Sequence, residues 1–181
     1  QNPDNQIVAT VVEEDVAFAL ENMGVPTQEI RTRIDEAMEA AGILKYKDRA
    51  PHNLSGGQKR RVAIAGVIAM KPEVLVLDEP AAGLDPRGRR EILGGLRDYV
   101  NYGGASVILV SHSMEDMAHY CDNVVVMNSA KVYRTGTVEN IFSEADALTS
   151  VGLDVPMISR VCAELKKRGI NLNGKLYTVE G

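Results

Sequence analysis

The chain of 181 residues has a composition typical of a globular protein, with 45% hydrophobic and 25% charged residues, and its length predicts one compact domain with a small appendage. Its 20 Lys and Arg against 25 Asp and Glu leave a net charge of −5, which disfavours a general role in coating nucleic acid. No apolar run approaches the ~18–20 residues that cross a bilayer, and the first residues lack the pattern of a signal peptide. The two cysteines, Cys121 and Cys162, lack CxxC spacing, which predicts reduced thiols that pack in a cytosolic protein.

The first part of the chain predicts a helical region. Residues 1–10 are polar and begin with neither Met nor a helix cap, as a fragment would, so we expect residues before Gln1 to be missing. Apolar spacing predicts three helices, over 11–23, 28–41 and 56–70, and Gly42 supplies a stop for the second.

The rest of the chain predicts strands that alternate with helices. Short apolar runs at 74–77 and 107–110 are typical of strands buried on both faces, as parallel sheets require. The remaining elements are expected in this order: helices over 87–99 and 114–120, a hairpin of 124–127 and 132–134 around Ser129 and Ala130, and helices over 138–142 and 156–168, with Asp154 opening and Gly169 closing the last. This order is typical of an α/β domain followed by a small helical tail.

A glycine-rich segment opens the third predicted helix: Leu54, Ser55, Gly56, Gly57 and Gln58. Ser55 and Gln58 fit a capping box, so one interpretation is a well-capped helix start. The other is a phosphate site, because two glycines expose backbone N–H groups at the positive end of the helix dipole. This segment alone leaves both interpretations open. The residues that follow, Lys59, Arg60 and Arg61, are interpreted as a solvated helix face, although their place beside a phosphate site would also favour an anion, and they are assigned no catalytic role.

Two adjacent carboxylates follow the first apolar strand, at the edge where open α/β sheets bind ligands. Neighbouring side chains of a strand point to opposite sides, so Asp78 and Glu79 can have different roles. We expect Asp78 to hold Mg²⁺, directly or through water, and Glu79 to polarise the water that attacks in phosphoryl transfer. An acidic turn would explain this pair in isolation, but its occurrence together with the glycine-rich helix start favours the phosphate interpretation.

These two segments resemble the signature motif and the Walker B strand of ABC transporter nucleotide-binding subunits. Three further positions match in the family's order: Gln1 at the Q-loop, Asp85 in the D-loop at 83–85, and His112 at the switch loop. The resemblance implies that the signature residues contact the γ-phosphate bound by the opposite subunit and that Asp85 crosses the dimer interface. It also implies that His112 senses the γ-phosphate and that Gln1 serves both catalysis and Mg²⁺ binding. Considered alone, His112 would be interpreted as a strand-end histidine satisfied by its neighbours.

Longer stretches are similar to the ATPases of energy-coupling factor importers for cobalt and vitamins, at 1–6, 15–18, 24–26, 113–117, 152–156 and 166–170. Such importers usually carry two related ATPases, and the chain has features of each, so no subtype is assigned. The resemblance implies ATP and Mg²⁺ as cofactors and a second ABC ATPase subunit as dimer partner. It also implies a transmembrane coupling protein, a membrane protein that selects the substrate, a peripheral position on the cytoplasmic face of the membrane, and no nucleic acid.

One motif of the family has no counterpart in the sequence. The P-loop, G-x-x-x-x-G-K-[ST], uses its amides and lysine to cradle phosphates. A near-match begins at Gly169, but Leu176 replaces the hydroxyl residue. It also follows a helix and precedes the strand-like 176–179, so it is interpreted as chance. We therefore expect the P-loop before residue 1, and we expect these residues alone to be inactive as an ATPase.

The combined pattern predicts part of a RecA-like P-loop NTPase core of ABC type, in the α/β class. Residues 1–72 are expected to hold the Q-loop and a helical subdomain with the signature, 73–136 the α/β core part, and 137–181 a C-terminal appendage that could serve in dimerisation. The predicted function is the C-terminal part of the ATP-hydrolysing subunit of an energy-coupling factor importer. Two alternatives remain: a naturally truncated subunit that completes a partner's site without hydrolysis, and a soluble ABC ATPase of DNA-repair type, which the lack of sustained heptads disfavours.

Overall fold

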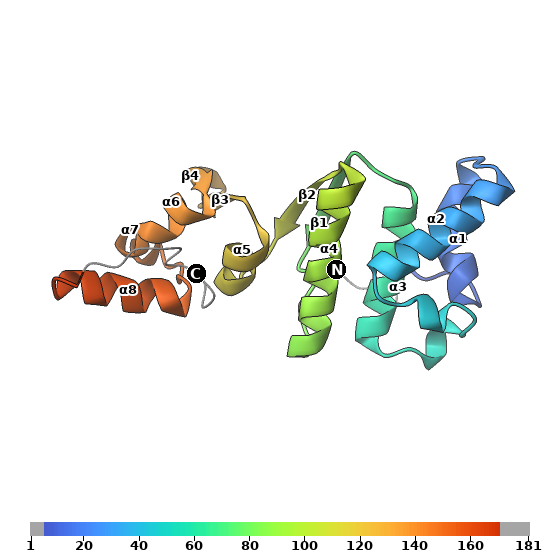
Figure 1. The fold of residues 1–181 in the computed structure, drawn as a ribbon, viewed down its shortest axis with the longest axis horizontal. Coiled ribbons are helices and arrows are strands. Elements are labelled where there is room, and N and C mark those ends of the chain that lie inside the picture. The colour runs from blue at the N-terminus through green and yellow to red at the C-terminus, as the bar shows by residue number, and fades with distance from the viewer. Residues whose placement is uncertain (1–5, 171–181) are drawn as a thin grey trace. The chain divides into compact units, whose positions relative to one another are not determined.

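The computed structural model describes residues 6–170, which form a mixture of helices and strands (Figure 1). The chain divides into two compact units, Gln1–Val110 and Ser111–Gly181. These units do not coincide with the predicted regions 1–72, 73–136 and 137–181, which were assigned by motif and stay a prediction. Among the helices of the described range, none combines the length and the apolar character that a membrane span requires.

The first unit begins with three helices, α1 (Val12–Asn22), α2 (Thr27–Ala40) and α3 (Gly56–Ala69), which pack against one another (Figure 1). Short 3-10 turns at Leu44–Tyr46 and Pro51–Asn53 join α2 to α3. Each helix lies within one residue of its predicted ends. Their apolar faces form a buried core, because the side chains recur at helical spacing on the facing sides. This core contains Val16, Leu20, Ile34, Met38, Val62 and Ala65.

The first unit continues with a two-stranded parallel sheet, β1 (Val74–Asp78) and β2 (Ser106–Val110), connected by α4 (Pro86–Gly103). The helix runs further than the predicted 87–99, because the chain stays helical until Gly104 adopts a left-handed φ of 69°. Gly95 permits a close approach between helices, since a Cβ there would lie 2.1 Å from the carbonyl oxygen of Ala40 in α2. The signature helix α3 and α4 therefore belong to the same packed unit as the sheet.

The expected burial of both sheet faces is wrong for one face. Leu75 on the α4 side is 3% exposed. The other face leaves apolar side chains 49–62% exposed, and these are Val74, Val76, Ile108 and Val110. An apolar run predicts two-sided burial because parallel strands normally have neighbours and helices on both sides. In the described residues the exposure of these four side chains shows that this apolar face is uncovered.

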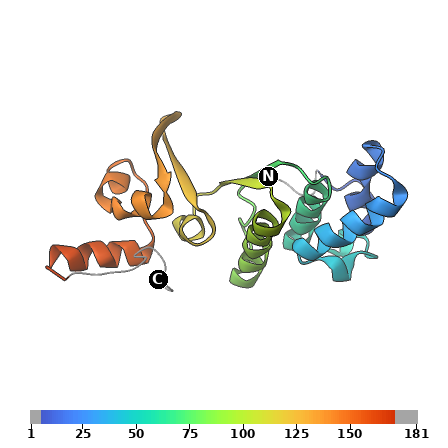
Figure 2. The ribbon, with the colours of Figure 1, turned by 45° about the horizontal axis from the view of Figure 1, so that its top comes forward.

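The second unit contains α5 (Met114–Tyr120), the antiparallel hairpin of β3 (Asn123–Asn128) and β4 (Lys131–Thr137), and the helices α6 (Val138–Ser143), α7 (Ala145–Ser150) and α8 (Met157–Lys167) (Figure 2). The predicted hairpin is confirmed, and its turn residues Ser129 and Ala130 have φ angles of 49° and 59°. The helix α7 was not predicted. Apolar side chains from the hairpin and the helices form the core of this unit, among them Val126, Ile141, Phe142, Leu148 and Cys162.

Candidate functional site

The glycine-rich segment 54–58 starts helix α3, and Ser55 is its N-cap. The Ser55 hydroxyl oxygen accepts a hydrogen bond from the Gln58 N–H at 3.3 Å, and the Ser55 N–H donates to Gln58 Oε1 at 2.9 Å. The capping box is therefore confirmed. It uses the amide of the third helical residue, whereas the first-turn amides of Gly56 and Gly57 have no partner within a helix of this geometry. Capping and phosphate binding at this helix start are thus compatible.

The two glycines have different surroundings. A Cβ on Gly56 would meet no atom within 4 Å, so the space in front of this residue is open. A Cβ on Gly57 would lie 2.7 Å from Leu84 Cδ2. Gly57 therefore lets the predicted D-loop pack against the helix start, while Gly56 leaves room for a ligand to approach the backbone.

The strand β1 delivers Asp78, an exposed residue, to the carboxyl edge of the sheet, and the chain turns at Glu79. Glu79 has a φ of 48°, in the left-handed region that non-glycine residues seldom occupy. Its N–H donates to the Val110 carbonyl at 2.9 Å, which continues the ladder between β1 and β2. Its carbonyl accepts from the Ala82 N–H at 3.1 Å. Such strained residues are enriched at functional sites, which supports a role for Glu79 in the chemistry.

Arg60 and Arg61 contradict their interpretation as a solvated helix face. Arg60 is partly buried, and its Nη1 donates to the carbonyl oxygens of Glu79, at 3.3 Å, and of Ala82. Its guanidinium therefore joins the signature helix to the turn that carries Glu79. No sequence signal identifies this contact, because the acceptors are main-chain carbonyls 19 and 22 residues further along.

Arg61 is 8% exposed and joins α3 to two other helices. Its Nη2 donates to the Gly88 carbonyl at 3.3 Å and pairs with Glu91 Oε2 at 2.7 Å, both on α4. Its Nη1 donates to the Ala41 carbonyl, at the end of α2, at 3.5 Å. Hydrogen bonds from Arg87 and from Arg61 lower the pKa of the Glu91 carboxyl. The apolar packing of this unit thus encloses one charged side chain, which is satisfied by carbonyls and a carboxylate.

Asp85 of the predicted D-loop caps α4. Its Oδ1 accepts from the Gly88 N–H at 3.1 Å, and Pro86 occupies the first helical turn, a favoured place for proline. A Cβ on Gly88 would lie 2.7 Å from that carboxylate oxygen, so a larger residue there would shift the Asp85 side chain. Within this chain Asp85 is therefore a structural residue, and its crossing of a dimer interface stays a prediction.

The remaining predicted site residues lie elsewhere. Gln1 lies outside the described residues, as do 171–176 of the near-match that begins at Gly169. His112 belongs to the second unit and is exposed. The serines on either side of it order the start of α5: Ser113 accepts from the Asp116 N–H at 3.3 Å, and the Ser113 N–H donates to Ser111 Oγ at 3.1 Å. The first unit contains 54–58, Asp78, Glu79 and Asp85, and Arg60 and Leu84 connect the helix of the first to the turn that follows β1.

Asp78 offers an exposed carboxylate at this edge, a donor type that suits a magnesium ion. Among the described residues, no three His, Cys, Asp or Glu side chains gather into a potential metal cluster. Mg²⁺ does not need one, because it keeps several waters and takes one or two protein carboxylates together with substrate phosphates. A single exposed carboxylate at Asp78 meets that requirement.

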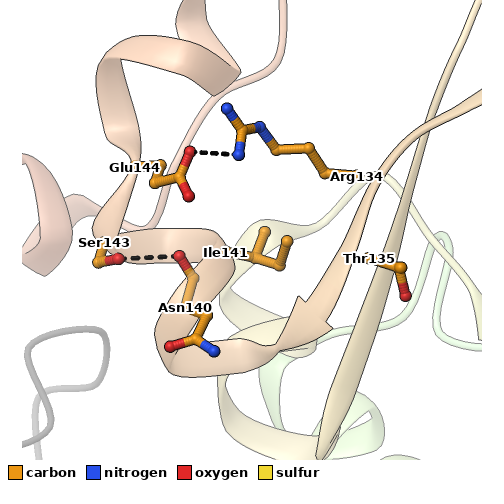
Figure 3. Close-up of a pocket in the computed structure, with 6 residues that line it drawn as sticks. All are labelled: Arg134, Thr135, Asn140, Ile141, Ser143 and Glu144. Carbon is orange, nitrogen blue, oxygen red and sulfur yellow. Dashed lines mark hydrogen bonds and ion pairs between the residues drawn. The ribbon is translucent and has the colours of Figure 1, made fainter.

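Two surface pockets are lined by other residues, the first of them by residues on either side of 54–58. A pocket of about 330 Å³ in the first unit is lined by Ile7, Ala9, Thr10, Pro51, His52 and Lys59. A pocket of about 430 Å³ in the second unit is lined by Arg134, Thr135, Asn140, Ile141, Ser143 and Glu144 (Figure 3). In the latter, Arg134 is paired with Glu144 at 2.6 Å, and Ser143 donates to the Asn140 carbonyl at 2.8 Å. Its polar groups are thus largely engaged with one another, and neither pocket is lined by a predicted site residue.

The order of these motifs agrees with a comparison with known families. Residues 2–82 match the family described as ABC transporter. These residues are part of an ABC transporter ATPase domain.

Relatives in this family include several energy-coupling factor proteins. The chain is 51% identical over 180 residues to the energy-coupling factor transporter ATP-binding protein EcfA1 of Caldanaerobacter subterraneus subsp. tengcongensis, covering 99% of this chain and 65% of the relative. It is 47% identical over 182 residues to EcfA2 of Clostridium tetani, covering 99% and 63%. The chain thus spans less than two thirds of the length of these curated relatives. Its similarity to both proteins agrees with leaving the subtype unassigned.

Solved ABC ATPase structures share the fold. CbiO1 from Clostridium perfringens, described as part of the ABC transporter complex CbiONQ, aligns with a TM-score of 0.74 and 42% identity over 90% of this chain and 64% of that protein. The cassette MJ0796, solved as a dimer in a post-hydrolysis state with ADP and Pi, aligns with a TM-score of 0.66 and 25% identity over 76% of this chain and 60% of that one. The predicted P-loop NTPase class is therefore confirmed.

Proposed function

We propose that this ABC ATPase chain is part of the ATP-binding and ATP-hydrolysing subunit of an energy-coupling factor importer for metal ions or vitamins. The observation that carries the proposal is the contact of helix α3 with the turn after β1, where Arg60 donates to the Glu79 carbonyl and Gly57 packs against Leu84. The names of the EcfA1, EcfA2 and CbiO1 relatives support the transport system. They do not support the DNA-repair alternative.

In this proposal the two carboxylates have separate roles. Asp78 would hold Mg²⁺, which would neutralise the charge that develops on the phosphates during transfer. The Glu79 carboxylate orients the attacking water and accepts its proton, as a general base must. The sequence contains no G-x-x-x-x-G-K-[ST] motif, so we expect turnover to require a P-loop that these residues do not supply.

The signature segment would act on a nucleotide held by a second ATPase subunit. The helix dipole and the first-turn amides of α3 favour a negatively charged γ-phosphate. His112 would sense the same group in this subunit's own site, and Gln1 would contribute to Mg²⁺ binding. The dimeric MJ0796 structures support a dimer of ATPases. A transmembrane coupling protein and a separate substrate-selecting membrane protein would complete the importer at the cytoplasmic face.

The substitution Glu79→Gln tests this proposal in the full-length protein assembled with its partners. The amide keeps the shape of the side chain but cannot take up a proton, so the transition state loses more stabilisation than the bound ground state. We expect ATP binding to persist and hydrolysis to be lost, measured by nucleotide binding and phosphate release.

The matched control is Glu73→Gln, which removes an exposed carboxylate just before the opposite end of β1 and should leave turnover unchanged. Hydrolysis near the wild-type rate in Glu79→Gln would remove Glu79 as the general base and would contradict the proposed mechanism.

A further inference from the structure

We propose that Arg60 is a positioning residue for ATP hydrolysis, which fixes the Glu79 carboxylate by holding the backbone of the turn that carries it. The inference rests on the proposed role of Glu79 as general base. It assigns a function to a side chain that the sequence pattern presents as part of a solvated helix face.

The turn needs stabilising contacts from other segments because Glu79 is not a glycine and yet has a left-handed backbone conformation. A φ of 48° is unfavourable for a residue with a Cβ, so this conformation persists only where the surroundings over-determine it. The Glu79 N–H is fixed by the Val110 carbonyl, and its own carbonyl by the Ala82 N–H and by Arg60. Relaxation to a negative φ would turn the Cα–Cβ bond and move the carboxylate away from its place at the sheet edge.

Arg60 is suited to this hold because its acceptors lie at both ends of the same turn. Its Nη1 carries two hydrogens, and it donates to the carbonyl oxygens of Glu79 and Ala82. Hydrogen bonds from an ionised donor are stronger than neutral ones, and these are partly shielded from water. The two bonds therefore restrain the residues between them as one unit.

The neighbouring arginine provides an internal contrast. Arg61 points toward Ala41, Gly88 and Glu91, which belong to the helical framework. Arg60 instead reaches the strand end of the candidate site. The helix that carries Arg60 begins at the signature segment, which is proposed to contact the partner's nucleotide. Glu79 is proposed to act on this subunit's own nucleotide. Arg60 therefore connects the signature helix to the backbone of Glu79.

The test is Arg60→Met in the full-length, assembled ATPase, because methionine keeps an extended apolar stem and removes the donors. We expect kcat per bound ATP to fall about tenfold or more, which corresponds to about 1.4 kcal/mol of transition-state stabilisation. The KM for ATP and the stoichiometry of ATP binding should stay close to wild type. Arg60→Lys, which keeps a charged donor without the planar fork, should restore part of kcat.

The control is Arg90→Met, which removes the same charge from an exposed position on α4 and should leave kcat unchanged. Wild-type kcat in Arg60→Met overturns the inference. So does a loss of kcat that is matched by a loss of ATP-binding stoichiometry, since that result indicates a general folding role. If the methionine variant does not fold, Arg60→Lys decides: reduced kcat at full stoichiometry supports the inference, and wild-type kcat overturns it.

The same measurements separate this inference from the proposed function. If Glu79→Gln abolishes hydrolysis while Arg60→Met retains wild-type kcat, only the positioning role fails. If Glu79→Gln retains hydrolysis, the general-base assignment fails, and the role of Arg60 fails with it.

Discussion

The two units of the chain use charged side chains in different ways. In the first unit, Arg60 and Arg61 leave the solvent and donate to main-chain carbonyls of distant segments. In the second unit, ion pairs lie at the surface, with side chains 40–88% exposed, and these are Arg134 with Glu144, Arg160 with Asp154, and Lys167 with Asp146. Exposed pairs contribute little because water and salt screen them, whereas an unsatisfied buried polar group is costly. The two arginines of the first unit therefore restrain distant segments of the chain, whereas these exposed pairs of the second unit contribute little to stability.

The largest expected effect is a loss of hydrolysis when a charge is placed in the open space next to Gly56. Gly56→Asp introduces a carboxylate into a space without neighbouring atoms, and an acidic residue is favourable in the first turn of a helix. The fold should survive with unchanged or slightly raised stability, while hydrolysis at the site shared with the partner's P-loop should collapse. Single-site turnover in a mixed dimer, with circular dichroism as a check of folding, measures both.

Thr27→Asp is the matched control for this substitution, since Thr27 is the first residue of α2, a helix of the same 14-residue length as α3. It should leave turnover intact. Equal turnover in the two variants would reduce the segment 54–58 to an ordinary helix start.

Removal of the buried guanidinium should give the next largest effect, on stability. Arg61→Met removes a donor to the Ala41 carbonyl at the end of α2 and a second donor to the Gly88 carbonyl within α4, and an unsatisfied buried acceptor costs about 1–3 kcal/mol. Denaturant unfolding should show a loss of at least about 1 kcal/mol. Arg87→Met, which removes the exposed partner of the same Glu91, should change stability far less. Similar losses in both variants would contradict the distinction between buried and exposed arginines.

The helix caps allow a comparison at smaller magnitude. Ser55→Ala and Thr137→Ala each remove an N-cap side chain, at α3 in the first unit and at α6 in the second. Both should reduce the free energy of unfolding by about 0.5–2 kcal/mol. Only Ser55→Ala should also lower turnover of the folded protein, because its hydroxyl can donate to a phosphate. If neither substitution affects turnover, Ser55 acts as a cap alone.

The pH dependence of stability should reveal the carboxylate that pairs with the arginines. Hydrogen bonds from Arg87 and Arg61 lower the pKa of Glu91 below its ordinary value of 4.5. A carboxyl with a lowered folded-state pKa stabilises the protein above that ordinary value, and the contribution is lost as the pH falls through the folded-state pKa. The stability difference between wild type and Glu91→Gln should therefore shrink on acidification from neutral pH. Denaturant unfolding at a series of pH values measures it, and a constant difference would contradict the assignment.

The smallest effect is expected at the surface of the second unit. The pair of Arg160 and Asp154 joins side chains that are 59% and 61% exposed. Arg160→Ala should change the free energy of unfolding by no more than about 0.5 kcal/mol. A loss comparable to that of Arg61→Met would show that the second unit also depends on its charges.

Secondary structure was predictable where local chemistry determines it. The helices of the first unit follow from apolar spacing, and α5 has its predicted ends at Met114 and Tyr120. The hairpin follows from two apolar runs around a short turn. In contrast, α7 gave no signal, because it has six residues and its N-cap, Glu144, makes no side-chain capping bond. A helix that short is fixed by packing, here through the buried Leu148, and not by its own sequence.

The motifs of the candidate site were predictable from the sequence, but the contacts that position its residues were not. The segment 54–58 and the pair Asp78 and Glu79 have recognisable spacing. The contact that restrains the Glu79 turn has no recognisable spacing, because Arg60 donates to main-chain carbonyl oxygens, which every residue possesses. The open sheet face was mispredicted for a related reason: an apolar run shows that side chains avoid water, but not which segment covers them.

That open sheet face also affects the tendency of these residues to aggregate in solution. Val74, Val76, Ile108 and Val110 form an apolar strip on a two-stranded sheet. Such strips adhere to one another, to detergent and to chaperones, and a net charge of −5 supplies only modest repulsion between molecules. We therefore expect these residues to aggregate more readily when the four side chains are exposed than when another segment or molecule covers them.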